Sequence, residues 1–382
     1  MFTNANDSTV CLLLPTPESD PVSEIYVSDE EYDDGFDDKF EAVLAKLVEF
    51  ERSADPARVE PVRAEPVTVV EESELAVAAA EPTRVVPRVW TVFLTLLLTI
   101  GAIVVAQIGL VMLLAIGMTA AGVPSQELGA RLMKIVSHPA GFIGLGLVSQ
   151  LLIGLAAVLP AKLSRTPMRQ RLGLVAARLP NWGYPVVMIA SLLPASLGFL
   201  AAASLAEVIP PDNSVATLFE GMTPGWAIPF VLFISLAPGL MEELLFRGYL
   251  QTRLLQRWKP GFAIVVSSSL FALFHITPHS MALAFIAGLY LGVLAWRTGS
   301  IWPGVLCHAF INGSVNVLRL GEMFGAWSGS TSSVIAITLI GLSVVCFGVS
   351  VWLMIKAPSA ENLRCSRTRE HSTRLSVGLA QA

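Results

Sequence analysis

The chain has 382 residues, of which 54% are hydrophobic and only 14% are charged, and its mean hydropathy is +0.65. Soluble globular domains carry about 25% charged residues. The composition therefore excludes a wholly soluble protein and predicts one that lies in a lipid bilayer. We expect no nucleic-acid partner.

Residues 1–87 are strongly acidic, with 21 acids against 6 bases, whereas residues 88–382 hold 9 acids against 19 bases. The first segment is rich in Asp, Glu, Pro and Ser and cannot bury enough apolar surface to fold alone. We therefore predict a largely disordered acidic tail joined to a mildly basic membrane body. We consider a protein partner as one role for this tail.

Eight apolar segments follow the tail, and each is long enough to cross a bilayer. They predict an all-α fold, a polytopic membrane helix bundle with about eight transmembrane helices. The segments lie near 89–119, 140–162, 182–208, 225–250, 261–278, 280–296, 301–319 and 332–355.

The basic residues of the loops predict the orientation. Lys and Arg are frequent in the loops that follow the second and fourth segments and in the C-terminal tail. The loop after the third segment holds Asp212 and Glu220 and no base. Because basic loops stay in the cytoplasm, we expect a multi-pass protein of the cell membrane with both termini cytoplasmic.

Three charged residues, Glu242, Glu243 and Arg247, lie inside the fourth apolar segment. A charged side chain at bilayer depth costs at least about 2.5 kcal/mol and usually has a function. Glu243 and Arg247 are four residues apart, so they share a helix face and can pair. Glu242 lies about 100° round the helix, which leaves it free of the arginine and available as a general base.

Two later segments carry further polar residues at helical spacing. Phe271 precedes His275 by four residues, and His308 precedes Asn312 by four. Counted at ~1.5 Å per residue from a common membrane face, these groups and Glu243 lie about 14 to 24 Å deep. Pro238 predicts a kink just before the glutamates, of the kind that lines a water-filled cavity. We therefore expect one buried site that water can reach.

The three motifs together resemble a known family. Residues 242–247 read as EExxxR, residues 271–275 as FxxxH and residues 308–312 as HxxxN. In this order they look like the CPBP family of intramembrane glutamic endopeptidases, which includes the type II CAAX prenyl proteases and the Abi, bacteriocin-processing proteins. The resemblance implies hydrolysis of membrane-associated or lipidated peptides. It implies roles for six residues: water activation by Glu242 and His275, oxyanion stabilisation by His308 and Asn312, and orientation or neutralisation of the site by Glu243 and Arg247.

On this basis the chain divides into five parts. The membrane body begins after the acidic tail and carries the protease-like core in its second half. The predicted parts are the tail 1–87, N-terminal transmembrane helices 88–223, a CPBP-like catalytic core 224–320, the last transmembrane helix 321–356 and a basic cytoplasmic tail 357–382.

Three other readings of the same residues stay open. Two histidines and the glutamates could hold zinc, although no HExxH motif is present and the four cysteines form no CxxC pair. Buried carboxylates and histidines also suit a proton-coupled transporter. A non-catalytic immunity or scaffold protein is the third reading. We expect no cofactor, with zinc as the alternative, and the residues alone do not separate the roles of His275 and His308.

Overall fold

The structure is a computed structural model that describes residues 2–4, 7–11, 88–164, 166–210, 218–219 and 221–356. The chain forms two units, Met1–Thr83 and Arg84–Ala382. In the first unit, strands β1 (Phe2–Asn4) and β2 (Asp7–Cys11) pair in antiparallel fashion. The rest of the predicted acidic tail, and the predicted basic tail, lie outside the described residues.

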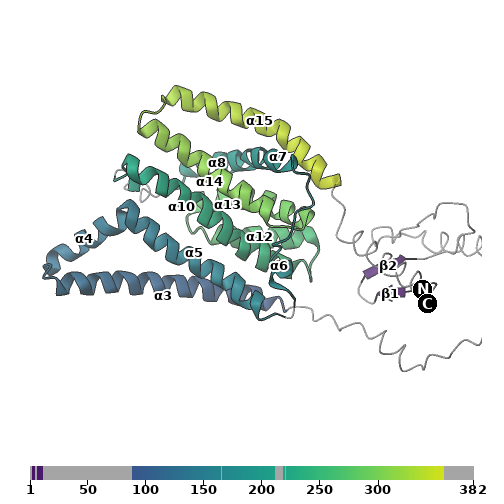
Figure 1. The fold of residues 1–382 in the computed structure, drawn as a ribbon, viewed down its shortest axis with the longest axis horizontal. Helices are drawn as coiled ribbons and strands as arrows, with labels where there is room; N and C mark the ends of the chain where they lie inside the picture. Colours follow the sequence, from purple (N-terminus) through teal and green to yellow (C-terminus); the bar gives the residue numbers. More distant parts are fainter. Residues whose placement is uncertain are drawn as a thin grey trace, which may run out of the picture. The chain divides into compact units, whose positions relative to one another are not determined.

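Among the described residues of the second unit, all regular secondary structure is helical, which confirms the predicted all-α membrane body (Figure 1). Its helices, in chain order, are α3 (Trp90–Ala120), α4 (Ser125–Ser137), α5 (Pro139–Lys162), α6 (Met168–Arg171), α7 (Gly183–Ala190), α8 (Leu192–Ala206), α10 (Pro224–Glu243), the π-helix η3 (Leu244–Gln251), α11 (Thr252–Leu254), α12 (Pro260–Leu273), α13 (Pro278–Thr298), α14 (Trp302–Met323) and α15 (Gly329–Lys356).

Six of the eight predicted segments form helical spans that are long and apolar enough to cross a membrane. The other two segments are helical as well, but they do not qualify. Helix α12 has only 14 residues and is ~21 Å long, shorter than a bilayer core of about 30 Å. Helix α14 carries His308, Asn312 and Arg319, which lower its hydropathy. The structure confirms the prediction of a membrane protein, but it does not confirm the predicted count of eight spanning helices.

The helix that carries the two glutamates lies at the centre of the bundle. Figure 1 shows α3 and α5 on one side, α15 on the other, and α10, α12, α13 and α14 between them. The apolar part of the span Pro224–Leu254 is 44% buried, whereas that of α3 and that of α15 are each 11% buried. The outer helices therefore face lipid, and α10 is surrounded by protein.

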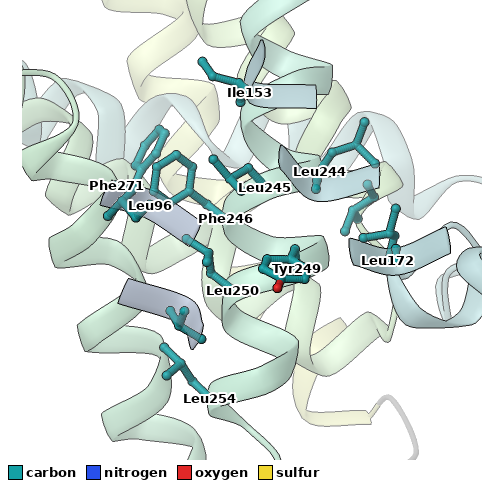
Figure 2. Close-up of a cluster of buried hydrophobic side chains, with 14 of the residues drawn as sticks. Leu96, Ile153, Leu172, Leu244, Leu245, Phe246, Tyr249, Leu250, Leu254 and Phe271 are labelled. Atoms are coloured by element: carbon teal, nitrogen blue, oxygen red, sulfur yellow. The ribbon is translucent and has the colours of Figure 1, made fainter. Parts of the chain in front are cut away.

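The π-helix directly after Glu243 anchors the site. All eight residues of η3 are buried, and its apolar side chains form the main core cluster with Leu96, Ile153 and Phe271 (Figure 2). A π-helical turn inside an α-helix is rare and is frequently found at a functional site. Because η3 is packed on every side, the backbone position of Glu243 is fixed by its neighbours.

Candidate active site

Glu243 and Arg247 form a buried ion pair, as their spacing predicts. The Arg247 Nη1 donates to Glu243 Oε1 at 2.8 Å, and the two residues are 1% and 0% exposed. The other terminal nitrogen of Arg247 donates to the carbonyl of Gly288 at 3.1 Å. Its guanidinium also lies 4.3 Å from the centroid of the Phe271 ring, a favourable cation–π distance. The charge of Glu243 is therefore neutralised inside the bundle.

His308 from α14 lies between the two glutamates. Its Nδ1 is 3.3 Å from Glu243 Oε1, and its Nε2 is 3.9 Å from Glu242 Oε2. Because the Glu243 oxygen is a carboxylate acceptor, we assign the proton to Nδ1, which leaves Nε2 directed at Glu242. Gly304, one turn earlier, permits this approach: a Cβ there would lie 2.9 Å from Glu243 Oε2.

Glu242 is held differently from its neighbour. It keeps 7% of its surface exposed, as does His308, whereas Glu243 has none. Its Oε1 accepts a hydrogen bond from Gln150 Nε2 at 3.0 Å. Its Oε2, like Glu243 Oε2, has no hydrogen-bond partner within the part of the chain that the structure describes, but Glu243 also carries the Arg247 ion pair. Glu242 is thus separate from Arg247, as predicted, and one of its two oxygens is available.

Gln150 is the neighbour that the sequence interpretation missed. It lies on α5, and it reaches a carboxylate 92 residues further along the chain. Ser149 and Gln150 are the polar residues in the middle of the otherwise apolar segment 140–162. A polar side chain at that depth is a signal of a buried partner. The sequence does not say which partner.

His275 lies in the turn after α12 rather than within a helix, because α12 ends at Leu273. Its Nδ1 is 2.9 Å from the carbonyl oxygen of Phe271. The Phe271 ring lies 4.8 Å from the His275 ring and 5.8 Å from the His308 ring and meets both edge to face. Of the residues described, neither glutamate lies within hydrogen-bond distance of His275.

Asn312 contacts the backbone of α10 instead of the other site residues. Its Nδ2 donates to the carbonyl oxygen of Ile234 at 3.1 Å. Pro238 lies four residues after Ile234 and has no N–H, so this carbonyl loses its helical partner. Asn312 supplies the missing donor and ties α14 to α10. An amide nitrogen carries two hydrogens, so one donor of Asn312 is still available.

A double-mutant cycle should show this tie. Asn312→Ala leaves the Ile234 carbonyl without a donor and should lower the free energy of unfolding by about 1 to 3 kcal/mol. Pro238→Ala restores an N–H that can bond to the same carbonyl, so the cost of Asn312→Ala should be clearly smaller in that background. Thermal unfolding of the four purified proteins measures both values. If Asn312→Ala lowers the free energy of unfolding equally in the unmodified protein and in the Pro238→Ala background, Asn312 does not replace the missing proline N–H.

The described residues do not form a ligand set for the zinc ion of the alternative hypothesis. Residues 88–356, apart from the gaps at 165, 211–217 and 220, contain no group of three or more His, Cys, Asp or Glu side chains arranged to hold a metal ion. Cys307, beside His308, is fully buried and donates to the carbonyl of Val187 at 3.3 Å. It is a core residue in this arrangement.

A buried carboxylate with one unpartnered oxygen beside a histidine can act as a general base. Residues 224–314 match the family model called Rce1-like, described as type II CAAX prenyl endopeptidase Rce1-like. The match confirms the resemblance to the CPBP family over residues 224–314. At the family level, this match supports an intramembrane protease of the CAAX type. No curated protein and no solved structure matches the chain.

Proposed function

We propose that the protein is a glutamic intramembrane endopeptidase that cleaves membrane-associated or lipidated peptides. The observation that carries the proposal is the unpartnered Glu242 Oε2, which lies 3.9 Å from His308 Nε2 in a buried site. A carboxylate oxygen in this setting accepts a proton from water. The match of residues 224–314 to the Rce1-like family supports the same chemistry.

Water activation is the first step. Glu242 Oε2 accepts one proton from a bound water molecule as the water oxygen attacks the peptide carbonyl carbon. We assign the proton on His275 to Nδ1, which faces the Phe271 carbonyl, so its Nε2 is left as an acceptor. His275 therefore assists Glu242 in orienting or deprotonating the water. The proton taken by Glu242 then passes to the leaving amine, and the C–N bond breaks.

Stabilisation of the oxyanion falls to α14 in this proposal. When doubly protonated, His308 keeps Nδ1 on Glu243 and donates from Nε2 to the tetrahedral oxyanion. The second N–H of Asn312 is the other donor. Glu243 and Arg247 act one step away from the substrate, since they hold His308 by its Nδ1 and balance the charge. In this proposal the six predicted site residues have the roles that the family resemblance implies, and Asn312 also ties two helices together.

The substrate class follows from where the site lies. The carboxylates are inside a helix bundle whose outer helices present apolar side chains to lipid. A peptide held at the bilayer by a lipid chain or an apolar segment is concentrated at such a site. In this proposal both ends of the membrane body face the cytoplasm, as the distribution of Lys and Arg predicts.

Cleavage in liposomes tests the proposal. The purified protein should hydrolyse a farnesylated CAAX peptide or a membrane-anchored peptide without a prenyl group, with defined products in mass spectrometry. Comparing the two peptides tells which anchor matters. Activity should persist in a chelator, because carboxylate and histidine chemistry needs no metal.

Two results would count against it. Activity lost to chelator and restored by zinc would support the metal-dependent reading. Absence of cleavage of both peptides, together with proton-driven uptake of a solute, would support the transporter.

A further inference from the structure

Gln150 links the proposed base to a helix outside the family match. It lies on α5, whereas the matched segment is 224–314. Its Nε2 donates to Glu242 Oε1 at 3.0 Å. The N-terminal helices of the bundle therefore contribute a side chain to the site, and the matched segment is incomplete without it.

The packing of α5 against α10 makes this contact possible. Gly146 and Gly154 lie four residues before and after Gln150, so all three share one face of α5. A Cβ at Gly146 would lie 2.5 Å from the ring of Phe233, and one at Gly154 would lie 2.6 Å from Met241 Sδ. Small residues thus bring the two helices close enough for the amide to reach the carboxylate.

The chemistry of an amide suits this place. An arginine holds Glu243, whereas a neutral group holds Glu242, so Glu242 is oriented without being neutralised. The contact occupies Oε1 and leaves Oε2 facing His308 Nε2. Gln150 Oε1 and Glu242 Oε2 are both buried acceptors with no donor among the described residues. A buried acceptor without a donor costs free energy unless a water molecule or a substrate satisfies it.

We infer that Gln150 is a positioning residue of the active site, which holds one oxygen of Glu242 so that the other accepts the proton of water. This inference rests on the proposed function. In the described ranges, the titratable and charged groups around Glu242 are His308 on α14, and Glu243 and Arg247 along its own helix. His275 joins them as the second base of the proposed mechanism. Gln150 is the group that α5 contributes.

The pH–rate profile of Gln150→Met tests the inference. Methionine keeps the length of the side chain but cannot donate a hydrogen bond. A hydrogen bond to a charged carboxylate favours the deprotonated form of that carboxylate. On the acidic side of the profile, kcat falls as the base is protonated. Loss of the Gln150 hydrogen bond should move this acidic limb up by about one pH unit. The kcat at neutral pH should fall about ten-fold, while KM changes little. Gln150→Glu, which adds a like charge, should move the limb further.

Gln107→Met is the matched control. Gln107 on α3 donates to the Leu145 carbonyl at 2.9 Å and to Ser149 Oγ at 2.7 Å, so it ties α3 to α5 without touching Glu242. The Gln107→Met variant should have the acidic limb of kcat at the same pH as the unmodified protein. Thermal unfolding of each variant separates folding from chemistry.

The outcomes distinguish the two proposals. If Gln150→Met folds and keeps the wild-type limb while Glu242→Gln is inactive, the proposed function stands and the role of Gln150 is wrong. If kcat falls equally in Gln150→Met and Gln107→Met with no shift of the limb, Gln150 is only structural. If Glu242→Gln is active, the proposed mechanism itself fails. Should Gln150→Met not fold, Gln150→Leu, which also cannot donate a hydrogen bond, carries the test by the same criterion.

Discussion

Replacing Glu242 with glutamine should abolish peptide cleavage while leaving the fold intact. Glutamine has almost the same shape, but its amide cannot accept the proton of the attacking water. A general base contributes about 10²- to 10⁴-fold to the rate, so kcat should fall by at least that factor. Peptide products measured by mass spectrometry, with the protein in liposomes, give the rate.

Glu207→Gln is the control for this substitution, because Glu207 is an exposed carboxylate at the end of α8. Its activity should match that of the unmodified protein. The thermal unfolding midpoint of Glu242→Gln should also be unchanged or higher, since a buried charge has been removed. Full turnover by Glu242→Gln would rule out the carboxylate as the base.

The second large effect concerns stability. Arg247→Met leaves Glu243 fully buried without its cation, and removing one partner of a buried ion pair costs about 3 to 5 kcal/mol. Glu243→Leu combined with Arg247→Met removes both charges and should regain most of that loss. The double variant should still have at least ten-fold lower kcat, because His308 has lost the acceptor of its Nδ1. Chemical unfolding in detergent and cleavage in liposomes measure the two properties separately.

The exposed pair Arg131–Glu127 provides the comparison. It has the same four-residue spacing and a distance of 2.7 Å, but its side chains are 54% and 53% exposed. Arg131→Met should therefore change the free energy of unfolding by less than about 1 kcal/mol. A similar loss in Arg131→Met and Arg247→Met would mean that burial is not the cause.

Local spacing predicted the parts of the site that lie on one helix or at one depth. The Glu243–Arg247 pair follows from a four-residue separation, and His308 was expected at the depth of the glutamates. The end of α12 was placed too late, near residue 278. Thr277 accepts from the Ser280 N–H as a helix cap and Pro278 begins the next helix, so the preceding helix has to end earlier.

Two contacts could not be predicted because they depend on which helix faces meet. The segment 140–162 is apolar all round, so periodicity does not show that Gln150 faces α10. Asn312 and Pro238 were both singled out from the sequence, yet their link through the Ile234 carbonyl requires α14 and α10 to be neighbours. Both contacts join helices that are far apart in the chain, and tertiary packing alone decides them.

The lengths of the helices impose a shape on the surrounding lipid. Helix α3 has 31 residues and is ~46 Å long, whereas α12, with 14 residues, is ~21 Å long. A hydrocarbon layer of about 30 Å fits neither, so α3 has to tilt and the layer thins beside α12. Phe262 and Leu273, at the two ends of α12, are 57% and 59% exposed and meet that lipid. We therefore expect the hydrocarbon layer to be thinner beside α12 than beside α3.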